Sequence, residues 1–391
     1  MRDRIKYLPV NWIDGMKINK NHFIAQDNAW SDALNDVSSV NASHIRFGII
    51  PASAEGEDNY NVKISLDNQN VLRVTVLSCQ AITPGGLRIN LPVTNSSENI
   101  GPGTDGNPSV SFSFSDSKAE AQWWVILIIH PFQKKPAGNP DLTENPPRYP
   151  YVLPTYSVEV VSDSQYNQYA YNPYALTIGK VAVSGNDVRV DNDYIPPCFS
   201  IDAYDDLKTL HAELDNFLAN LEVRCSQIIQ KIYKKNQQNE ISELVQFLCD
   251  RMVLFLSSAI TQMRWTILYE SPSALFAIIV SLARLMKNSI DLRIGSGKEE
   301  MMNYLIEWSE LKQGELETML TSLANFKYDN NDINQNIPKI IRFVKATSTL
   351  FETLSKLEFI GKKKDSGIFV KEEPQSFSDT NQNKARRRFF G

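Results

Sequence analysis

The chain has 391 residues, of which 42% are hydrophobic and 22% charged, so it can bury the cores of two or three globular domains. Its formal net charge of −5 lacks the basic bias that is typical of nucleic-acid-binding proteins, and we expect no nucleic-acid partner. The four cysteines lie far apart without a CxxC pair, which indicates neither a zinc ribbon nor a disulfide framework. We expect Cys79, Cys198, Cys225 and Cys249 to be reduced, buried thiols.

The first residues do not have the pattern of a secretory signal peptide, because only a few apolar residues follow Arg4 before Asn11. The longest apolar stretches, Trp123–Ile129 and Leu275–Val280, fall short of the ~18 residues that a membrane helix needs. We therefore predict a cytoplasmic protein without direct membrane insertion.

The stretch from Leu8 to Trp30 combines a Trp, an Asp-Gly turn, a Met and an Asn-His-Phe sequence before any regular strand or helix pattern. Gly15 accepts positive φ, so Asp14-Gly15 predicts a turn. Asn21 is positioned to cap a helix from His22 to about Leu34. We interpret this stretch as a loop that binds a partner.

From about residue 40 to Pro197 the pattern is that of short strands. Asn61–Asp67 and Val71–Leu77 alternate apolar and polar residues around a turn-forming Asp67-Asn-Gln-Asn70, which predicts a hairpin. Trp123–Ile129 is apolar on both faces and predicts a central strand. Further candidate strands are Leu87–Leu91, Val110–Phe114, Tyr156–Val161, Leu176–Val183 and Val188–Val190. Such regular short strands are typical of a β-sandwich or barrel.

Two loops of this half are distinctive. Asn95–Pro108 is rich in Gly, Ser and Asn, and Gln133–Pro150 carries five prolines. Closely spaced prolines favour extended geometry, so the second loop is either an arm that binds a neighbouring subunit or a solvated loop without a partner.

The strand pattern stops at Tyr194-Ile-Pro-Pro-Cys198, which we interpret as a hinge because proline ends a ladder. A helix from about Ser200 to Lys235 follows, with apolar residues at alternating steps of three and four. This spacing predicts a coiled-coil seam. The candidate oligomerisation residues are Leu207, Leu210, Leu214, Phe217 and Leu221.

Four more helices are predicted. The second begins near Glu240 and the third at Ser271-Pro272, where Ser is a good cap and Pro suits the first turn. A fourth, from Met302 to Leu323, follows the break at Gly295-Ser-Gly297, and a fifth runs from Ile337 to Leu354. Apolar stripes of this kind pack within one chain or between chains. After Ile360 the composition becomes basic and polar, which predicts a flexible tail.

Catalysis is not predicted. The four histidines, His22, His44, His130 and His211, form no HxH or HExxH pair, and no glycine-rich phosphate-binding motif is present. We expect a protein that is not an enzyme, without cofactor or metal.

The Leu8–Trp30 stretch resembles the amino-terminal signature of the TssK family, the type VI secretion baseplate subunits. That signature reads Val-x-Trp-x-Glu-Gly-Met-x-Leu-x-Pro-Gln-His-Phe-x-x-Gln-Asp. The matching residues are Val10, Trp12, Gly15, Met16, His22, Phe23, Gln26 and Asp27, with Asp14 replacing Glu and Ile18 replacing Leu. Lys20-Asn21 stands where the family has Pro-Gln. Ile195-Pro-Pro197 and the Pro-led third helix are similar to the family as well.

The resemblance implies an α+β multidomain fold. It comprises an antiparallel β-sandwich shoulder over residues 1–197, similar to phage receptor-binding proteins, a helical-bundle neck over 198–360, and a tail over 361–391. It implies a homotrimeric adaptor between baseplate wedge proteins of the TssF and TssG type and an envelope complex at the inner face of the cell envelope. We expect the carboxy-terminal head domain of proteobacterial members to be either missing or reduced to the last helix and the tail, because too few residues follow the neck.

The wedge-binding residues implied are Trp12, Asp14, Gly15, Met16, His22, Phe23, Gln26 and Asp27. Buried anchors dominate the binding energy of most interfaces, so we expect Trp12, Met16 and Phe23 to contribute most. The alternative is an arm folded onto its own sandwich. A second function class is a trimeric receptor- or glycan-binding spike, in which exposed Tyr166, Tyr169, Tyr171 and Tyr174 would stack on sugars. Unpaired cysteines and the missing export signal argue against it.

Overall fold

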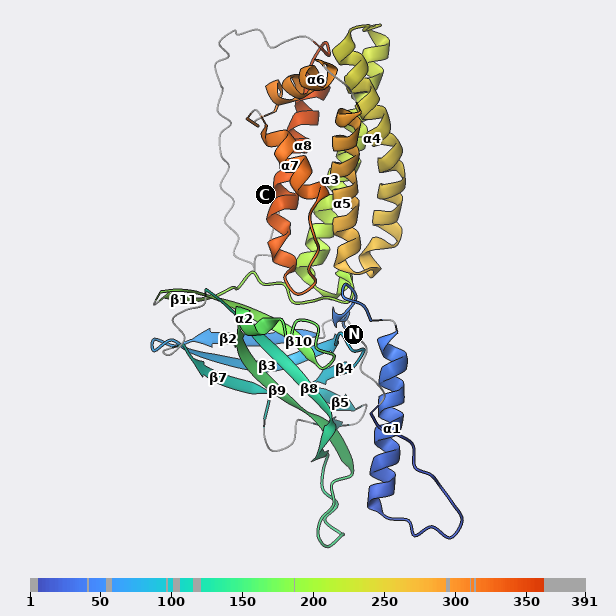
Figure 1. Ribbon diagram of the computed structural model, residues 1–391, viewed down its shortest axis with the longest axis vertical. Helices are drawn as coiled ribbons and strands as arrows, with labels where there is room; N and C mark the ends of the chain where they lie inside the picture. Colours follow the sequence, from blue (N-terminus) through green and yellow to red (C-terminus); the bar gives the residue numbers. More distant parts are fainter. Residues whose placement is uncertain are drawn as a thin grey trace. The chain divides into compact units, whose positions relative to one another are not determined.

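The computed structural model describes residues 6–40, 42–53, 58–95, 98–100, 106–114, 121–185, 187–292, 296–309, 311–312 and 314–361. Within these ranges the chain forms two compact units (Figure 1). The first holds the residues up to Tyr204 together with Asp329–Asn334, and the second holds Asp205–Tyr328 and the residues from Gln335 onward. The fold is α+β with antiparallel sheets, as the sequence predicted.

One sheet of the first unit is built around β3 (Val71–Ile82). It pairs antiparallel with four strands: β1 (Gly48–Ile49), β2 (Tyr60–Leu66), β4 (Arg88–Leu91) and β7 (Ser109–Ser113). The pairing of β2 with β3 confirms the predicted hairpin. The predicted loop Asn95–Pro108 lies partly outside the described residues, and within it β6 (Glu98–Ile100) pairs with β5 (Val93–Asn95).

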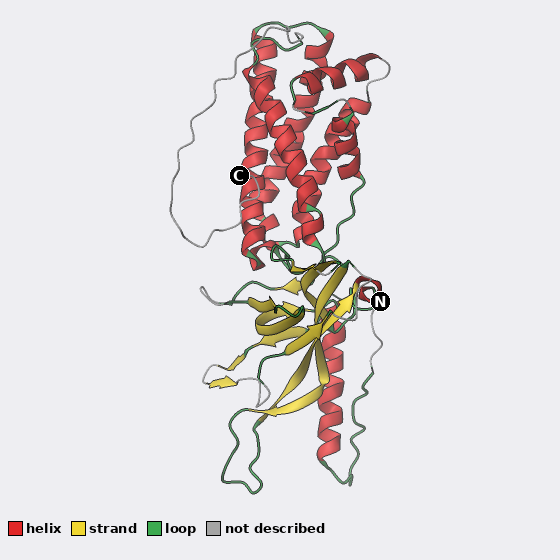
Figure 2. Cartoon of the chain, turned by 90° about the vertical axis from the view of Figure 1, so that its left-hand side faces the viewer, coloured by secondary structure: helices red, strands yellow, loops and turns green. Residues whose placement is uncertain are grey.

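The other sheet has the order β11 (Asp187–Val190), β10 (Ala175–Ser184), β8 (Gln122–Ala137) and β9 (Tyr151–Ser162). Figure 2 draws the strands of the first unit in yellow. Trp123–Ile129 of β8 is buried at every position, which confirms the predicted central strand. The proline-rich stretch is the tip of a hairpin, because Lys134–Ala137 pairs with Tyr151–Pro154. The exposed tip between them carries the backbone bridge of Asp141 with Arg148.

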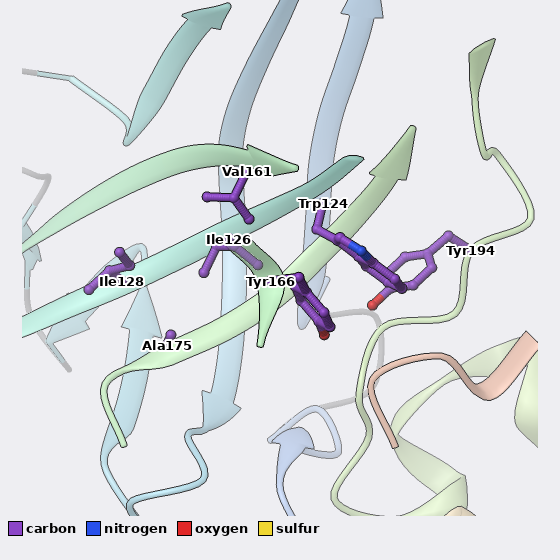
Figure 3. Packing of buried hydrophobic residues seen from close by; sticks show 7 residues of the cluster. All are labelled: Trp124, Ile126, Ile128, Val161, Tyr166, Ala175 and Tyr194. Carbon is purple, nitrogen blue, oxygen red and sulfur yellow. The ribbon is translucent and has the colours of Figure 1, made fainter. Parts of the chain in front are cut away.

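Aromatic side chains fill the core beside this sheet (Figure 3). The rings of Trp124 and Tyr166 stack with centroids 4.2 Å apart, and Tyr194 meets Trp124 edge-on at 6.3 Å. Tyr166 belongs to the short helix α2 (Asp163–Tyr166) that follows β9. The two sheets approach each other where the Tyr60 hydroxyl donates to the Ile178 carbonyl at 2.7 Å. This two-sheet arrangement fits the predicted class, while the sandwich topology stays a prediction.

The Pro-Pro segment is a fixed part of the first unit and not a free hinge. Ile49 N–H donates to the Pro197 carbonyl at 2.7 Å, and Phe199 N–H donates to the Ile49 carbonyl at 2.8 Å. Gly48, at φ 120°, lies so close that an added Cβ would sit 2.0 Å from the Pro197 carbonyl oxygen. Only glycine fits there, because any side chain would collide with this backbone. The predicted hinge is therefore wrong for residues 194–199.

The second unit is helical. Its elements are α3 (Asp205–Lys234), α4 (Glu240–Trp265), α5 (Pro272–Asp291), α6 (Ser296–Glu307), α7 (Glu315–Ala324) and α8 (Ile337–Lys356). Ser271 caps α5, and Pro272 occupies its first turn, as predicted. The predicted fourth helix is two helices, α6 and α7, because a left-handed Gly314 at φ 80° interrupts it. The bundle layout itself stays a prediction.

Two of these helices are long and apolar enough to cross a membrane by length and composition. α4 and α5 each contain an 18-residue window with a mean hydropathy of 1.4, which the sequence reading had not identified. About half of each window, 44% in α4 and 50% in α5, is buried within the chain. Burial of this kind is what the core helices of globular domains also show.

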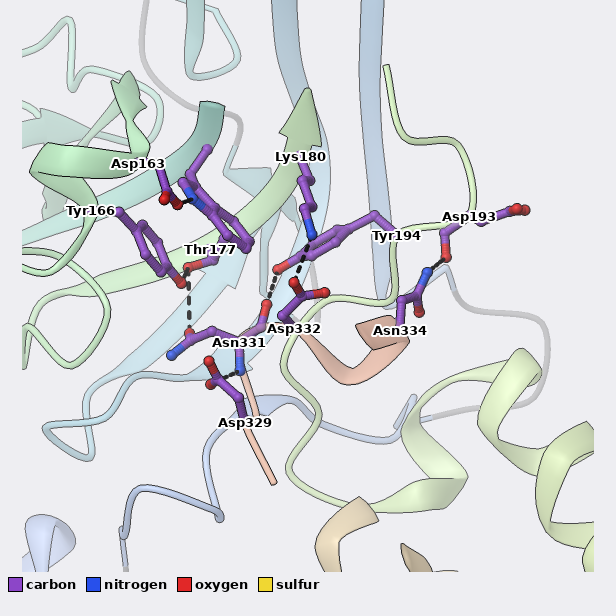
Figure 4. Close-up of polar contacts among 11 residues, drawn as sticks. Asp163, Tyr166, Thr177, Lys180, Asp193, Tyr194, Asp329, Asn331, Asp332 and Asn334 are labelled. Atoms are coloured by element: carbon purple, nitrogen blue, oxygen red, sulfur yellow. Dashed lines mark hydrogen bonds and ion pairs between the residues drawn. The ribbon is translucent and has the colours of Figure 1, made fainter. Parts of the chain in front are cut away.

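Residues 329–334, between α7 and α8, belong to the first unit (Figure 4). Lys180 pairs with Asp332 at 2.6 Å, and the Tyr194 hydroxyl donates to the Asn331 carbonyl at 2.8 Å. Asn330 donates to the Phe47 carbonyl at 2.9 Å. We call residues 329–334 the returning segment. The chain therefore passes between the two units three times, which the predicted division at residue 197 did not include.

Burial keeps the tyrosines of this network protonated. Loss of hydration raises the pKa of Tyr166 and of Tyr194, so both hydroxyls stay available as donors. Tyr166 contacts the Thr177 hydroxyl at 2.9 Å, and Thr177 in turn reaches Asn331 Oδ1 at 3.4 Å. The returning segment thus satisfies buried polar groups that the sheet alone would leave without partners.

Candidate partner-binding surface

The amino-terminal signature forms an irregular arm, residues 6–19, followed by helix α1 (Lys20–Ser39). Asn19 caps this helix, and not Asn21 as predicted. The Asn19 side chain accepts from Asn21 N–H at 2.9 Å, and His22 Nδ1 accepts from Asn19 N–H at 3.3 Å. This reciprocal capping box satisfies two backbone donors of the first turn. The predicted site residue His22 therefore orders the helix start.

Polar side chains on one face of α1 hold the arm. The Gln26 side-chain oxygen accepts from Val10 N–H at 3.1 Å and from Trp12 Nε1 at 3.4 Å. One turn and a half further on, Asp32 accepts from the backbone N–H groups of Lys6 and Tyr7. The signature residue Gln26 thus positions the Trp12 ring. Its side-chain oxygen bonds the arm of its own chain and is not offered to a partner.

The apolar members of the predicted set lie together beside the helix start. The Trp12 ring is 6.2 Å from the rings of both His22 and Phe23. Trp12 is 46% exposed and Phe23 is 58% exposed, so neither belongs to a core. Asp14 and Gly15 form a turn, in which Gly15 has φ 76°. Met16 lies at this turn and is half-buried. None of the eight predicted residues is buried, and Asp27 is exposed.

The prediction missed the rest of this surface. Trp30, Leu34 and Val37 continue the exposed side of α1 with exposed fractions of 64%, 65% and 66%. Ala29 is the buried residue of the helix. Trp30, Leu34 and Val37 are three, four and seven residues from one another, a helical spacing that is visible in the sequence. The helix was predicted to end at about Leu34, before Val37.

The five candidate oligomerisation residues are buried inside their own chain. The exposed fractions of Leu207, Leu210, Leu214, Phe217 and Leu221 range from 0% to 6%. α3 packs these side chains against other helices of the same unit, chiefly α4 and α8. They are therefore not available to a second chain, and the predicted seam is corrected to an intramolecular one.

The loop tyrosines are not the exposed cluster that sugar stacking would need. Tyr166 lies in the core against Trp124, and Tyr169 donates to Glu159 at 2.9 Å. The Tyr171 ring meets His44 edge-on at 4.6 Å, and Tyr174 carries the Lys6 ammonium 5.1 Å above its ring. The expected exposure of Tyr166 is wrong, because its aromatic ring completes the core beside the sheet.

The titratable groups that chemistry would use have structural contacts. His130 contacts the Ser157 hydroxyl at 2.9 Å, and His211 bonds the Met263 carbonyl at 2.8 Å. All four cysteines are buried, as predicted, and burial raises the pKa of Cys79 to about 12. Within the described ranges no group of three or more His, Cys, Asp or Glu side chains is placed to hold a metal ion.

A cavity of about 360 Å³ lies between the second half of α1 and the loops at the end of the sheets. Asp32 and Asp36 of α1 line one side, and the rings of His44, Tyr171 and Tyr174 line the other. None of the eight predicted wedge-binding residues lines it, whereas Tyr171 and Tyr174 of the sugar-stacking alternative do. The wedge-binding residues lie apart from this cavity, on the arm and the first half of α1.

No family model and no curated protein matches this chain. Solved structures do. A crystal structure of TssK is 14% identical and aligns over 94% of this chain and 72% of its own, with a TM-score of 0.46. A TssK-TssF-TssG baseplate subcomplex of the type VI secretion system is 12% identical over 89% of this chain and 100% of that chain, again with a TM-score of 0.46.

The baseplate complex from the type VI secretion system is similar to the same degree. It is 13% identical to this chain, covers 89% of it and 99% of the matched chain, and has a TM-score of 0.46. Two of these three solved structures are named for TssK, the family that the amino-terminal signature resembles, and the third is named for the type VI secretion baseplate.

Proposed function

We propose that this chain is a structural component of a type VI secretion baseplate and acts by binding other baseplate proteins, not by catalysis. The arm and the start of α1 form the docking site for wedge subunits of the TssF and TssG type. Trp12 and Phe23 are its apolar anchors, and Met16 supports the turn between them. The protein works as a trimeric adaptor at the inner face of the cell envelope, with the wedge on one side and an envelope complex on the other.

The exposed signature is the observation that supports this proposal. Its polar members His22 and Gln26 cap the helix and brace the arm, while the rings of Trp12 and Phe23 lie at the surface. A folded arm without a partner gains nothing from exposing a tryptophan and a phenylalanine side by side. Large aromatic side chains at the surface are the usual anchors of protein interfaces.

The trimer contact that we propose uses the outer side of α4, since the α3 seam is internal. Leu254 and Trp265 are 77% and 74% exposed, and Ser258 and Thr261 lie between them at helical spacing. This side carries no charge between Arg251 and Arg264. Depletion of charge with exposed aromatic and aliphatic residues is the composition of interface cores.

The substitution Trp12→Ala tests the docking site. We expect it to reduce co-purification with the TssF- and TssG-like wedge proteins at least tenfold, because the anchor ring is lost. The oligomer mass by light scattering and the melting temperature should change little, since Trp12 is half exposed. Tyr151→Ala is the matched control, an aromatic side chain 50% exposed elsewhere in the same unit.

Unchanged wedge binding by Trp12→Ala would contradict the docking site. Unfolding of this variant would mean that the arm is part of the core, which is the alternative that the sequence left open. For the trimer, Leu254→Asp should lower the solution mass to that of a monomer, and an unchanged mass would exclude the α4 side.

A further inference from the structure

Helix α1 carries a continuous apolar stripe on its outer side. Phe23, Trp30, Leu34 and Val37 are separated by seven, four and three residues, which places all four on one face of a helix. Their exposed fractions are 58%, 64%, 65% and 66%. We call these four residues the α1 stripe.

The opposite face of α1 is the one that contacts the chain. Ala29 and Asp32 lie there, with Ala29 buried and Asp32 bonded to the arm, while Gln26 lies beside the stripe and bonds the arm from that edge. Polar bonds and one small residue therefore fix the helix, and all of its large apolar side chains point elsewhere. A helix in water normally buries its apolar face.

The size of this surface indicates a macromolecular partner. With aromatic side chains offering 150–250 Å² each, the α1 stripe exposes on the order of 500 Å² of apolar surface. That is as large as the largest apolar patch of a typical monomer, which is often a functional one. The Trp12 ring, 6.2 Å from Phe23, extends it onto the arm.

The spacing favours a helix as the partner. Residues 23, 27, 30, 34 and 37 follow steps of four, three, four and three, which is the seam of a coiled coil. The second position of the seam is Asp27, whose carboxylate is exposed and makes no hydrogen bond or ion pair within the described ranges. A partner helix that packs on this seam meets four apolar side chains and one negative charge.

The charge distinguishes between possible occupants. α1 carries Lys20 against Asp27, Asp32 and Asp36, so its net charge is 1 − 3 = −2. An anionic membrane surface attracts helices rich in Lys and Arg and would repel this one. A parallel second copy in register would place Asp27 against Asp27, and like charges at a seam position are unfavourable. A lysine or arginine at that position is favourable.

We propose that α1 binds an amphipathic helix of a partner protein, whose apolar seam packs on the α1 stripe and whose lysine or arginine pairs with Asp27. This deepens the proposed function, on which it rests only in placing the partner among the baseplate proteins. The surface also extends the docking site by three residues that the family signature does not contain, namely Trp30, Leu34 and Val37.

Two synthetic helical peptides test the pairing on the full chain. Both carry leucine at every seam position over three heptads, except for one central position that is lysine in the first peptide and glutamate in the second. We expect the lysine peptide to bind at least tenfold more tightly, measured by the fluorescence of the exposed Trp30 and by calorimetry. The Asp27→Lys variant should bind the glutamate peptide more tightly than the lysine peptide.

Leu34→Asp is the second variant to test, and it should abolish binding of both peptides. Leu142→Asp is the matched control, because Leu142 is 79% exposed at the distant hairpin tip, and it should leave binding unchanged. Equal affinities of the two peptides for wild type and for Asp27→Lys would overturn the charge pairing. Peptide binding retained by Leu34→Asp would overturn the stripe as the contact surface.

Two further measurements address the other occupants. Flotation with phosphatidylglycerol-containing vesicles that Leu34→Asp abolishes would overturn the proposal in favour of a lipid surface. A lower solution mass of Leu34→Asp would overturn it in favour of a second copy. Suppose that the chain does not associate with wedge proteins but Asp27→Lys still exchanges its preference between the two peptides. The baseplate function then fails and this inference stands. If wedge binding depends on Trp12 and not on Leu34 or Asp27, the function stands and this inference fails.

Discussion

Two helices of this molecule share one apolar spacing and differ in what covers it. α3 carries Leu207, Leu210, Leu214, Phe217 and Leu221 at alternating steps of three and four, and all five are at most 6% exposed. α1 carries Phe23, Trp30, Leu34 and Val37 on a seam with the same steps, and all four are at least 58% exposed. Periodicity therefore identifies the apolar face of a helix but not its partner, which is α4 and α8 for α3 and, in our proposal, a helix of another protein for α1.

The two helices are also stabilised differently. α3 gains from burial of large side chains along 30 residues, whereas α1 depends on a capping box at Asn19 and on polar bonds from Gln26 and Asp32. Burial of a leucine contributes several times more free energy than one solvent-accessible hydrogen bond. We expect α1 to open independently while α3 opens only with the whole unit.

The largest effect is expected from shortening a buried seam residue. Leu214→Ala should lower the free energy of unfolding by about 4 kcal/mol, because it removes most of a buried aliphatic side chain and leaves a cavity. Leu34→Ala on α1 should lower it by less than about 0.5 kcal/mol. Urea titration followed by circular dichroism measures both. Equal losses would mean that the α1 stripe is covered in solution, which would contradict the contrast between a buried α3 seam and an exposed α1 stripe.

A second effect concerns the returning segment. Lys180→Met leaves Asp332, whose side chain is 8% exposed, as a buried carboxylate without its cation, and we expect a loss of about 3 kcal/mol. Lys356→Met is the control. It breaks a pair with Glu352 whose side chains are 72% and 44% exposed, and it should cost less than about 0.5 kcal/mol. Similar melting temperatures for both variants would show that residues 329–334 are not anchored as described.

The smallest effect is local to α1. Asn19→Ala removes the side chain that accepts from Asn21 N–H and should destabilise the helix start by about 1 kcal/mol. Hydrogen exchange should become several-fold faster in the first turns of α1 and stay unchanged in α3. Faster exchange in both helices would mean that they open as one cooperative unit, contrary to the contrast drawn from their burial.

Much of the fold was predictable because its signals are local. Alternation in Asn61–Asp67 and Val71–Leu77 and the Ser271-Pro272 helix start depend only on neighbours in sequence, and the structure has them. The fully apolar run Trp123–Ile129 also identified the most buried strand. The cap of α1 was misplaced by two residues, since Asn19 and Asn21 are equally good caps and only backbone geometry distinguishes them.

The rest depends on contacts between residues distant in the chain. Asp329–Asn334 has the composition of a solvated loop, and contacts with distant residues, among them Lys180, Tyr194 and the Phe47 carbonyl, make it part of the first unit. Tyr166 was expected at the surface as one of four loop tyrosines, yet Trp124 offers it a stacking partner in the core. At the site, the signature residues lie on the surface. Val37 was missed because α1 runs five residues beyond its expected end. Trp30 and Leu34 lie inside the expected helix and were missed because spacing alone does not show whether an apolar side chain is exposed.

The returning segment has a consequence for how this protein can be divided and how it can evolve. The first unit is discontinuous in sequence, so a fragment that stops at Tyr204 lacks the six residues that pair with Lys180 and Tyr194. Such a fragment would leave the buried Tyr194 hydroxyl and the Lys180 ammonium without the partners that they have in the intact chain. An exchange of the first 204 residues between related chains would meet the same problem, because residues 329–334 of the second half complete the polar network of the first unit. The sequence of this short segment is therefore tied to that of the sheet it contacts, more than a hundred residues earlier in the chain.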